Sequence, residues 1–114
     1  MNKKINLPQP IDTFYHASEV YDDALLASCF HEDAMLVDEG EEYHGPKAVS
    51  AHILKANRDA KVMTEIKDCI VKNGETVVTA IISGNFEGSP IPLAFNFTLN
   101  DGKIKNLNIE MVCE

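Results

Sequence analysis

The chain has 114 residues, enough for one globular domain and too few for two. Hydrophobic residues make up 45% and charged residues 25%, so a core can form without disulfide or metal staples. The formal net charge is -8, and the basic residues gather no further than the pair Lys3-Lys4. Nucleic acid and anionic membranes need a concentrated basic surface, so we expect neither as a partner. Long-range repulsion of anions favours a neutral or weakly polar small molecule as the ligand.

The cysteines Cys29, Cys69 and Cys113 lie in apolar runs, without the paired spacing of a disulfide framework or a metal site. We therefore predict buried, reduced thiols, no metal and no cofactor. The first ten residues contain a basic pair with no apolar segment behind it. This pattern predicts neither a signal peptide nor a membrane span, and hence a cytoplasmic location.

The first half of the chain has helical spacing. Residues 1–7 are expected to form a loose arm, and Pro10 fits the first turn of a helix, where its missing N–H is not needed. Asp22 is suited to cap a second, short helix. The apolar positions of the two helices follow a helical period and are Ile11, Phe14, Tyr15, Leu25, Leu26, Cys29 and Phe30.

A short strand and a third helix follow. The strand is predicted over residues 34–38 and is expected to end before Gly40. The third helix is predicted to begin at Gly45-Pro46. After residue 60 the hydrophobic period changes to two, which predicts strands. The predicted strands cover residues 62–72, 76–86, 92–99 and 103–113. The turns between them are predicted at Asn73-Gly74, Gly88-Ser89-Pro90 and Asn100-Asp101-Gly102. Helices first and an antiparallel meander after is an α+β pattern, in which the helices must cover the apolar face of the sheet.

Three segments, in this order, resemble motifs of the NTF2-like superfamily. Residues 23–34, DALLASCFHEDA, are similar to its D-x-L-x-x-x-F-x-x-D-A signature. Residues 45–49, GPKAV, resemble its G-x-x-A-I helix opening, and residues 101–104, DGKI, resemble its turn into the last strand. The resemblance implies a cone, in which a strongly bent antiparallel sheet wraps around three helices and leaves a pocket at the open end.

The resemblance also implies a homodimer formed through the outer face of the sheet. The alternating residues that we expect on this face are semi-polar, as a wet, hydrogen-bonded interface requires, and include Asn96, Thr98, Asn106, Asn108 and Glu110. Members of the superfamily include isomerases, dehydratases, epoxide hydrolases, cyclases and non-catalytic binding modules. The fold therefore does not by itself define the function.

Asp38 is the principal candidate for chemistry, because it follows three apolar residues where a strand leaves the core. In the ketosteroid isomerases that this chain resembles, a carboxylate at this interval after the motif is the base that moves a proton next to a carbonyl. Burial beside an apolar pocket makes a carboxylate a better base near neutral pH. The alternative is a strand-end aspartate that caps the turn at Gly40 or belongs to a solvated acidic run.

The donors that such isomerases use for the enolate oxygen are not preserved here. Phe14 stands where the resemblance implies a tyrosine, and Phe95 stands on or near the position of a protonated aspartate. Tyr15, one step round the helix, is the remaining candidate donor. We therefore do not expect steroid isomerase activity.

His52 follows Val49 by three residues and could turn toward the pocket as a base or ligand contact, or it could be an ordinary helix histidine. No two of the four histidines have metal-ligand spacing. The strand and helix phases predict a pocket lined by Phe14, Tyr15, Val37, Phe95, Phe97, Leu107 and Met111.

Two functions remain open at this point. The first is acid–base chemistry of the isomerase, lyase or cyclase type on an apolar carbonyl compound, with Asp38 as base and Tyr15 as donor. The second is a non-catalytic ligand-binding or dimerisation module. The missing donors favour the second function, and the strand-end aspartate favours the first.

Overall fold

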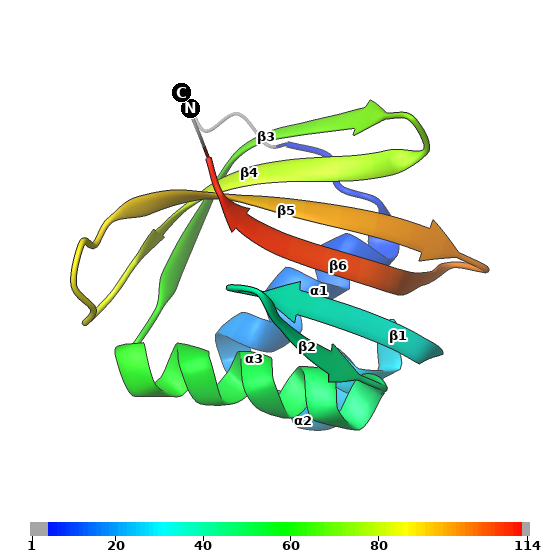
Figure 1. The fold of residues 1–114 in the computed structure, drawn as a ribbon, viewed down its shortest axis with the longest axis horizontal. Helices are drawn as coiled ribbons and strands as arrows, with labels where there is room; N and C mark the ends of the chain where they lie inside the picture. Colours follow the sequence, from blue (N-terminus) through cyan, green and yellow to red (C-terminus); the bar gives the residue numbers. More distant parts are fainter. Residues whose placement is uncertain (1–4, 113–114) are drawn as a thin grey trace.

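A computed structural model of the chain describes residues 5–112, so Cys113 and residues 1–4 of the expected arm lie outside the described residues (Figure 1). The expected α+β class is confirmed. The helices are α1 (Gln9–Val20), α2 (Asp23–Ser28) and α3 (Pro46–Ala60). The strands are β1 (Phe30–Asp38), β2 (Glu41–His44), β3 (Met63–Lys72), β4 (Glu75–Ser83), β5 (Ile91–Asn100) and β6 (Lys103–Met111).

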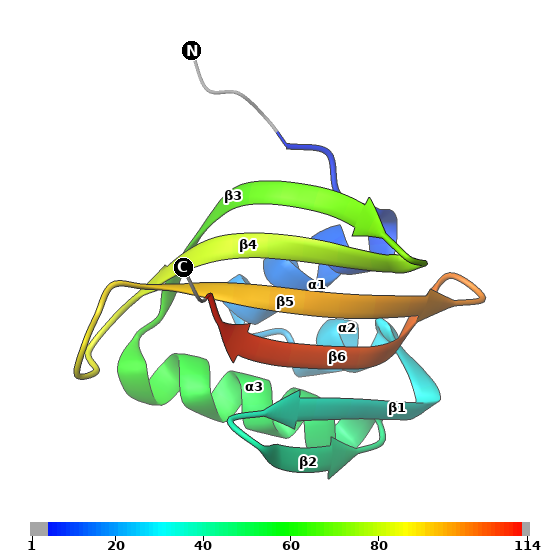
Figure 2. The ribbon, with the colours of Figure 1, turned by 45° about the horizontal axis from the view of Figure 1, so that its top comes forward.

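The six strands form one open, mixed sheet in the order β2-β1-β6-β5-β4-β3 (Figure 2). Neighbouring strands are antiparallel except β1 and β6, which run parallel, with Leu36 opposite Leu107. The expectation of a wholly antiparallel sheet is therefore wrong at this pair. The strand β1 joins the sheet beside a strand some seventy residues away, so no hairpin fixes their relative direction.

The β1–β2 hairpin positions the end of β1. Glu39 and Gly40 occupy the two-residue turn, both with positive φ, 54° and 81°. This is the turn geometry that matches the twist of a hairpin. The strand β1 begins at Phe30, four residues before the expected start at Ala34, and β2 is a strand that the sequence pattern does not predict. The strand β2 lies at an exposed edge of the sheet and begins with two glutamates, so its sequence lacks the apolar alternation that predicts a strand.

All three helices lie on one face of the sheet, and the strands curve around them (Figure 2). Between the two layers lies a single core, to which every helix contributes buried apolar residues. Burial of this apolar surface is the main source of stability for a domain of this size. The fully buried large side chains are Ile11, Phe14, Leu26, Leu36, Val49, Val78, Phe97, Ile104 and Leu107.

Two local contacts fix the ends of helices. The Asp22 carboxylate accepts a hydrogen bond from the backbone N–H of Leu25 at 3.0 Å, so it caps α2 as predicted. At the end of β4, a Cβ on Gly84 would lie 2.5 Å from the carbonyl oxygen of Ala60, so only glycine fits. The next residue, Asn85, donates its N–H to that oxygen at 2.6 Å, which joins β4 to the end of α3.

Candidate functional site

A cavity of about 560 Å³ opens between α1, α3 and the sheet. Its volume lies in the range of small-molecule sites, which are also mostly apolar. Asp38, Glu39 and Glu87 contribute its carboxylates, and Ser18, Asn57 and Thr64 contribute uncharged polar groups. The apolar lining comprises Phe14, Tyr15, Ile53, Ala56, Ala60, Val62, Ile82, Phe86, Ile91, Leu93, Phe95, Ile109 and Met111.

The phase of β1 brings Asp38 to the wall of this cavity. Side chains two apart on a strand share a face, so Asp38 lies on the side of the buried residues Ala34 and Leu36. The turn that begins at Glu39 ends the strand there. Asp38 is therefore the last residue of β1 that can reach the interior, and its side chain remains 23% exposed.

A hydrogen bond joins Asp38 to His52 of α3. The distance from Nε2 of His52 to Oδ2 of Asp38 is 2.9 Å, and each side chain is 23% exposed. Because an ionised carboxylate only accepts, Nε2 of His52 must carry the hydrogen when Asp38 is ionised. The imidazole also stacks on the ring of Tyr43 in β2, with centroids 4.0 Å apart and 17° between the planes. His52 is thus positioned by its stacking on Tyr43 and by its hydrogen bond to Asp38, and the same bond orients one oxygen of the carboxylate.

The other oxygen, Oδ1 of Asp38, has no hydrogen-bond partner within residues 5–112. In particular, the side chain makes no bond to the turn at Gly40, as the capping alternative would require. His52 lies behind Asp38, beside Tyr43, and is not part of the cavity lining. Asp38 is therefore the member of this pair that lines the cavity, and His52 is bonded to its Oδ2 from outside the lining.

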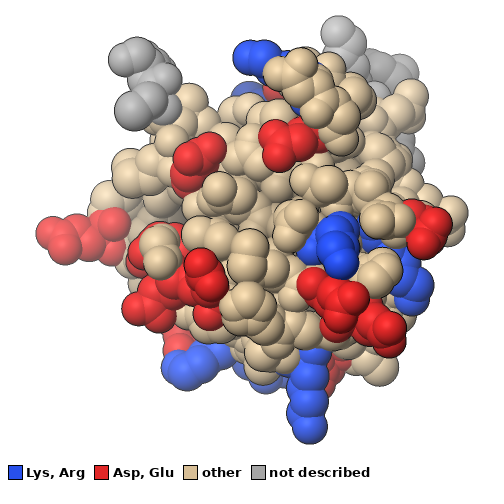
Figure 3. Space-filling model, turned by 45° about the vertical axis from the view of Figure 1, so that its right-hand side comes forward, with Lys and Arg blue, Asp and Glu red and all other residues tan. Residues whose placement is uncertain are grey.

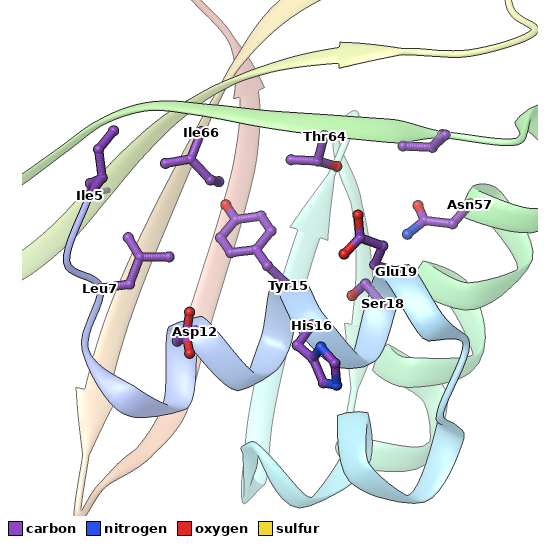
Figure 4. A pocket seen from close by; sticks show the side chains of 11 residues that line it. Ile5, Leu7, Asp12, Tyr15, His16, Ser18, Glu19, Asn57, Thr64 and Ile66 are labelled. Atoms are coloured by element: carbon purple, nitrogen blue, oxygen red, sulfur yellow. The ribbon is translucent and has the colours of Figure 1, made fainter. Parts of the chain in front are cut away.

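Tyr15 lies between the Asp38 cavity and a second cavity on the other side of α1. Its ring lines both, and its hydroxyl points toward β3, near Ile66 (Figure 4). This hydroxyl is buried and has no hydrogen-bond partner in the described part of the chain. Burial raises the pKa of Tyr15 well above 10, with a smaller contribution from Cys69, so the phenol stays protonated.

The predicted lining residues fall into two groups. Phe14, Phe95 and Met111 line the Asp38 cavity, with Met111 at its rim, 66% exposed. Phe97 and Leu107 face each other across β5 and β6 and are 0% and 1% exposed. On the same face of β5 and β6, Phe97 and Leu107 form the next pair after Phe95 and Ile109, farther from the cavity. They therefore belong to the core and not to the lining.

Val37 is on the opposite face of β1 from Asp38. Side chains alternate along a strand, so a single strand cannot present both residues to one cavity. The expectation that Val37 lines the pocket is therefore wrong, and Leu36 is the inward residue beside it.

Sequence reasoning missed Asn57, whose half-buried side chain lines the cavity from α3. A signal was available, because Val49, Ile53 and Asn57 follow one another at intervals of four along the helix. A polar residue in an otherwise buried stripe is typical of a position that contacts a ligand or a polar partner.

The surface has no concentrated basic region on the face shown in Figure 3, where Lys and Arg side chains lie among acidic groups and uncharged residues. Within residues 5–112, no three His, Cys, Asp or Glu side chains come together as a metal site would require. No helix in that range is long and apolar enough to cross a membrane.

The sequence matches the model of the SnoaL-like domain over residues 11–107. The chain therefore belongs to the SnoaL-like family, within the NTF2-like superfamily that the three sequence motifs predicted. No curated protein matches the sequence.

Solved structures agree with this assignment. A candidate polyketide cyclase from Sinorhizobium meliloti is 32% identical, with a TM-score of 0.86 over 91% of this chain and 95% of the other. A protein with a ketosteroid isomerase-like fold from Catenulispora acidiphila, in complex with trimethylamine, is 17% identical, with a TM-score of 0.78 over 92% and 86%. An NTF2-like protein of unknown function from Cytophaga hutchinsonii is 15% identical, with a TM-score of 0.76 over 98% and 95%. The last two similarities concern the fold alone.

Proposed function

We propose that this protein binds an apolar carbonyl compound in the Asp38 cavity and transfers a proton at the carbon next to the carbonyl. One observation carries the proposal: Asp38 lies at the wall of an apolar cavity with Oδ2 bonded to His52 and Oδ1 without a partner in the described chain. A positioned carboxylate beside a carbonyl compound is suited to general base catalysis.

The proposed step is a proton transfer to Asp38. Its carboxylate accepts the proton from the carbon, the C–H bond breaks, and the electron pair moves to the carbonyl oxygen as an enolate. The same carboxyl group then returns the proton to carbon. In a cyclisation, the enolate carbon instead forms a bond to a second carbonyl carbon of the same molecule, the C=O π electrons move to that oxygen, and the resulting alkoxide takes the proton from Asp38. Cyclisation of a polyketide begins with this step, so the similarity to a candidate polyketide cyclase supports the substrate class.

His52 is proposed as a positioning residue. Its bond to Oδ2 fixes the plane of the carboxylate, and its stacking on Tyr43 fixes the imidazole in turn. Preorganisation of this kind keeps the base within reach of the reacting carbon without a cost at the moment of reaction.

The enolate oxygen needs a donor, and Tyr15 is the donor expected from the sequence. Because the Tyr15 hydroxyl points toward β3, we propose the side-chain amide of Asn57 in its place. An amide N–H can stabilise developing negative charge on oxygen, although one neutral donor supplies less than a full oxyanion hole.

A second candidate function is binding without catalysis, and one observation favours it. Phe14 and Phe95, which stand at the expected donor positions, pack edge to face with ring centroids 6.4 Å apart. They give the Asp38 cavity apolar contacts where an isomerase would have acidic hydroxyl groups. A module that only holds an apolar compound needs no more than this.

Hydrogen–deuterium exchange separates the two functions. Apolar ketones of one to three rings are incubated with the protein in D₂O, and binding and exchange next to the carbonyl are followed by NMR. The proposal expects saturable acceleration of exchange with the ketones that bind. Saturable binding without accelerated exchange across the series would favour the binding module, and no binding by any of them would contradict both.

A further inference from the structure

A second cavity, the α1–β3 groove, lies between α1, β3 and the segment that precedes α1 (Figure 4). Its volume is about 450 Å³, which is large enough for a small molecule. Tyr15, Ser18, Asn57, Val62 and Thr64 line both this groove and the Asp38 cavity. The residues that line the groove alone are Ile5, Leu7, Asp12, His16, Glu19 and Ile66.

The charge of the groove is negative. Asp12 and Glu19 supply two carboxylates, and its described lining contains neither lysine nor arginine. The Glu19 carboxylate lies close to Thr64 and Asn57, whereas the ring of His16 turns away from β3 (Figure 4). Glu19 therefore makes one end of the groove acidic, whereas Leu7 and Ile66 give the other end apolar contacts, with Asp12 on α1 near Leu7.

The buried hydroxyl of Tyr15 is the second feature that indicates a ligand. It lies in the wall of the groove and has no hydrogen-bond partner in residues 5–112. A buried hydroxyl is nearly always paired in a folded protein, so one without a partner indicates a missing polar group. As a neutral phenol, its oxygen can accept a hydrogen bond from an N–H donor.

We propose that the α1–β3 groove binds a small protonated amine with an apolar body. The ammonium group lies between Glu19 and the Tyr15 oxygen, and the apolar body packs against Leu7 and Ile66. The net charge of -8 attracts cations over a distance. Residues 5–7 have no helix or strand and no backbone hydrogen bond within the described chain, so this part of the wall can shift to open the hydroxyl.

Titration of the ¹⁵N-labelled protein with benzylammonium chloride at pH 7 and low salt tests the proposal by NMR. We expect saturable shifts in residues 12–19 of α1 and 62–66 of β3, with a Kd on the order of 1 mM, as for a fragment of this size. Benzyl alcohol and benzoate, which share the ring but not the positive charge, should bind at least about 5-fold more weakly.

Variants locate the site. The double change Asp12→Asn with Glu19→Gln should weaken benzylammonium binding about 10-fold, and Tyr15→Phe about 3- to 10-fold. Glu41→Gln, on the opposite edge strand, and Asp38→Asn should each change benzylammonium binding less than about 2-fold.

The proposal does not depend on the chemistry at Asp38. Equal binding of benzyl alcohol, shifts centred on the Asp38 cavity, or no saturation up to about 50 mM would overturn it.

Discussion

Oδ2 of Asp38 lies 2.9 Å from Nε2 of His52, although fourteen residues separate the two in the sequence. The bond joins the end of β1 to the second turn of α3, across one side of the cavity. One oxygen of the carboxylate is therefore bonded to His52, and the other has no hydrogen-bond partner within residues 5–112.

Substitution of His52 should separate positioning from catalysis. His52→Gln keeps an N–H donor for Asp38, whereas His52→Leu removes it at similar volume. We expect ketone exchange to fall about 3-fold in the first variant and about 10- to 100-fold in the second, through kcat more than KM. A purely structural role would instead give two variants that differ in Tm but not in kcat.

The stability contribution of the Asp38–His52 pair should be small. Both side chains are partly exposed, so screening by water limits the pair to about 1 kcal/mol or less. Chemical denaturation of Asp38→Asn should therefore give a free energy of unfolding within about 1 kcal/mol of the wild type. A loss of several kcal/mol would show that the pair has a structural role.

Tyr15→Phe should leave the protein as stable as the wild type or raise its free energy of unfolding by about 1 kcal/mol. The change removes a buried hydroxyl that has no partner in the described chain, and such a group costs about 1–3 kcal/mol. Urea denaturation at pH 7 measures this difference. A clear destabilisation would mean that the hydroxyl makes a stabilising hydrogen bond.

The same residue predicts a dependence on alkaline pH. Burial raises the pKa of folded Tyr15 well above 10, so the unfolded phenol loses its proton first. Ionisation of Tyr15 therefore leaves the free energy of unfolding unchanged below about pH 10. It lowers this free energy as the pH rises from there toward the pKa of Tyr15 in the folded protein. Between pH 9 and 11 the wild type should lose more stability than Tyr15→Phe, and parallel curves would contradict this.

The fold was largely predictable from the sequence because its signals are local. The cap at Asp22, the turn at Asn73-Gly74 and the apolar alternation of β4 each depend on neighbouring residues. The parallel pairing of β1 with β6 and the edge strand β2 depend on contacts between distant segments, or on a strand without an apolar face. Local patterns do not contain that information.

The candidate site shows the same division. Asp38 was identified because a strand end after an apolar run is a local feature, but its bond to His52 joins two elements whose relative position no local pattern fixes. Phe97 and Leu107 were assigned to the correct face and the wrong depth. Alternation gives the face of a strand, and only the placement of the helices decides where the core ends and the cavity begins.

Cys29 should be unreactive in the folded protein. Burial raises the pKa of its thiol to about 11, and the side chain is 4% exposed. At pH 8 the thiolate fraction is then on the order of 10⁻³. Iodoacetamide labelling followed by peptide mapping should leave Cys29 unmodified until denaturant is added, and rapid labelling of the native protein would contradict its burial.

We propose that the protein is a homodimer formed through the outer face of the sheet. Asn96 on this face donates to Glu110 Oε2 at 3.0 Å and to the carbonyl oxygen of Asn108 at 3.2 Å, which orders a semi-polar surface. Light scattering after size exclusion should give about twice 12.6 kDa at micromolar concentration. Asn108→Lys should shift the population toward monomer, because two-fold symmetry doubles the introduced charge. A monomeric wild type would refute the proposal.

The central claim, that Asp38 is the base, is tested most directly by the exchange rate of Asp38→Asn with a ketone that the wild type turns over. The amide keeps the shape of the carboxylate and can still accept the His52 bond, but it does not take a proton at neutral pH. We predict unchanged ketone binding and a loss of exchange of about 10²–10⁴-fold, while Glu41→Gln retains the wild-type rate. Exchange within about 3-fold of the wild type in Asp38→Asn would show that Asp38 is not the base.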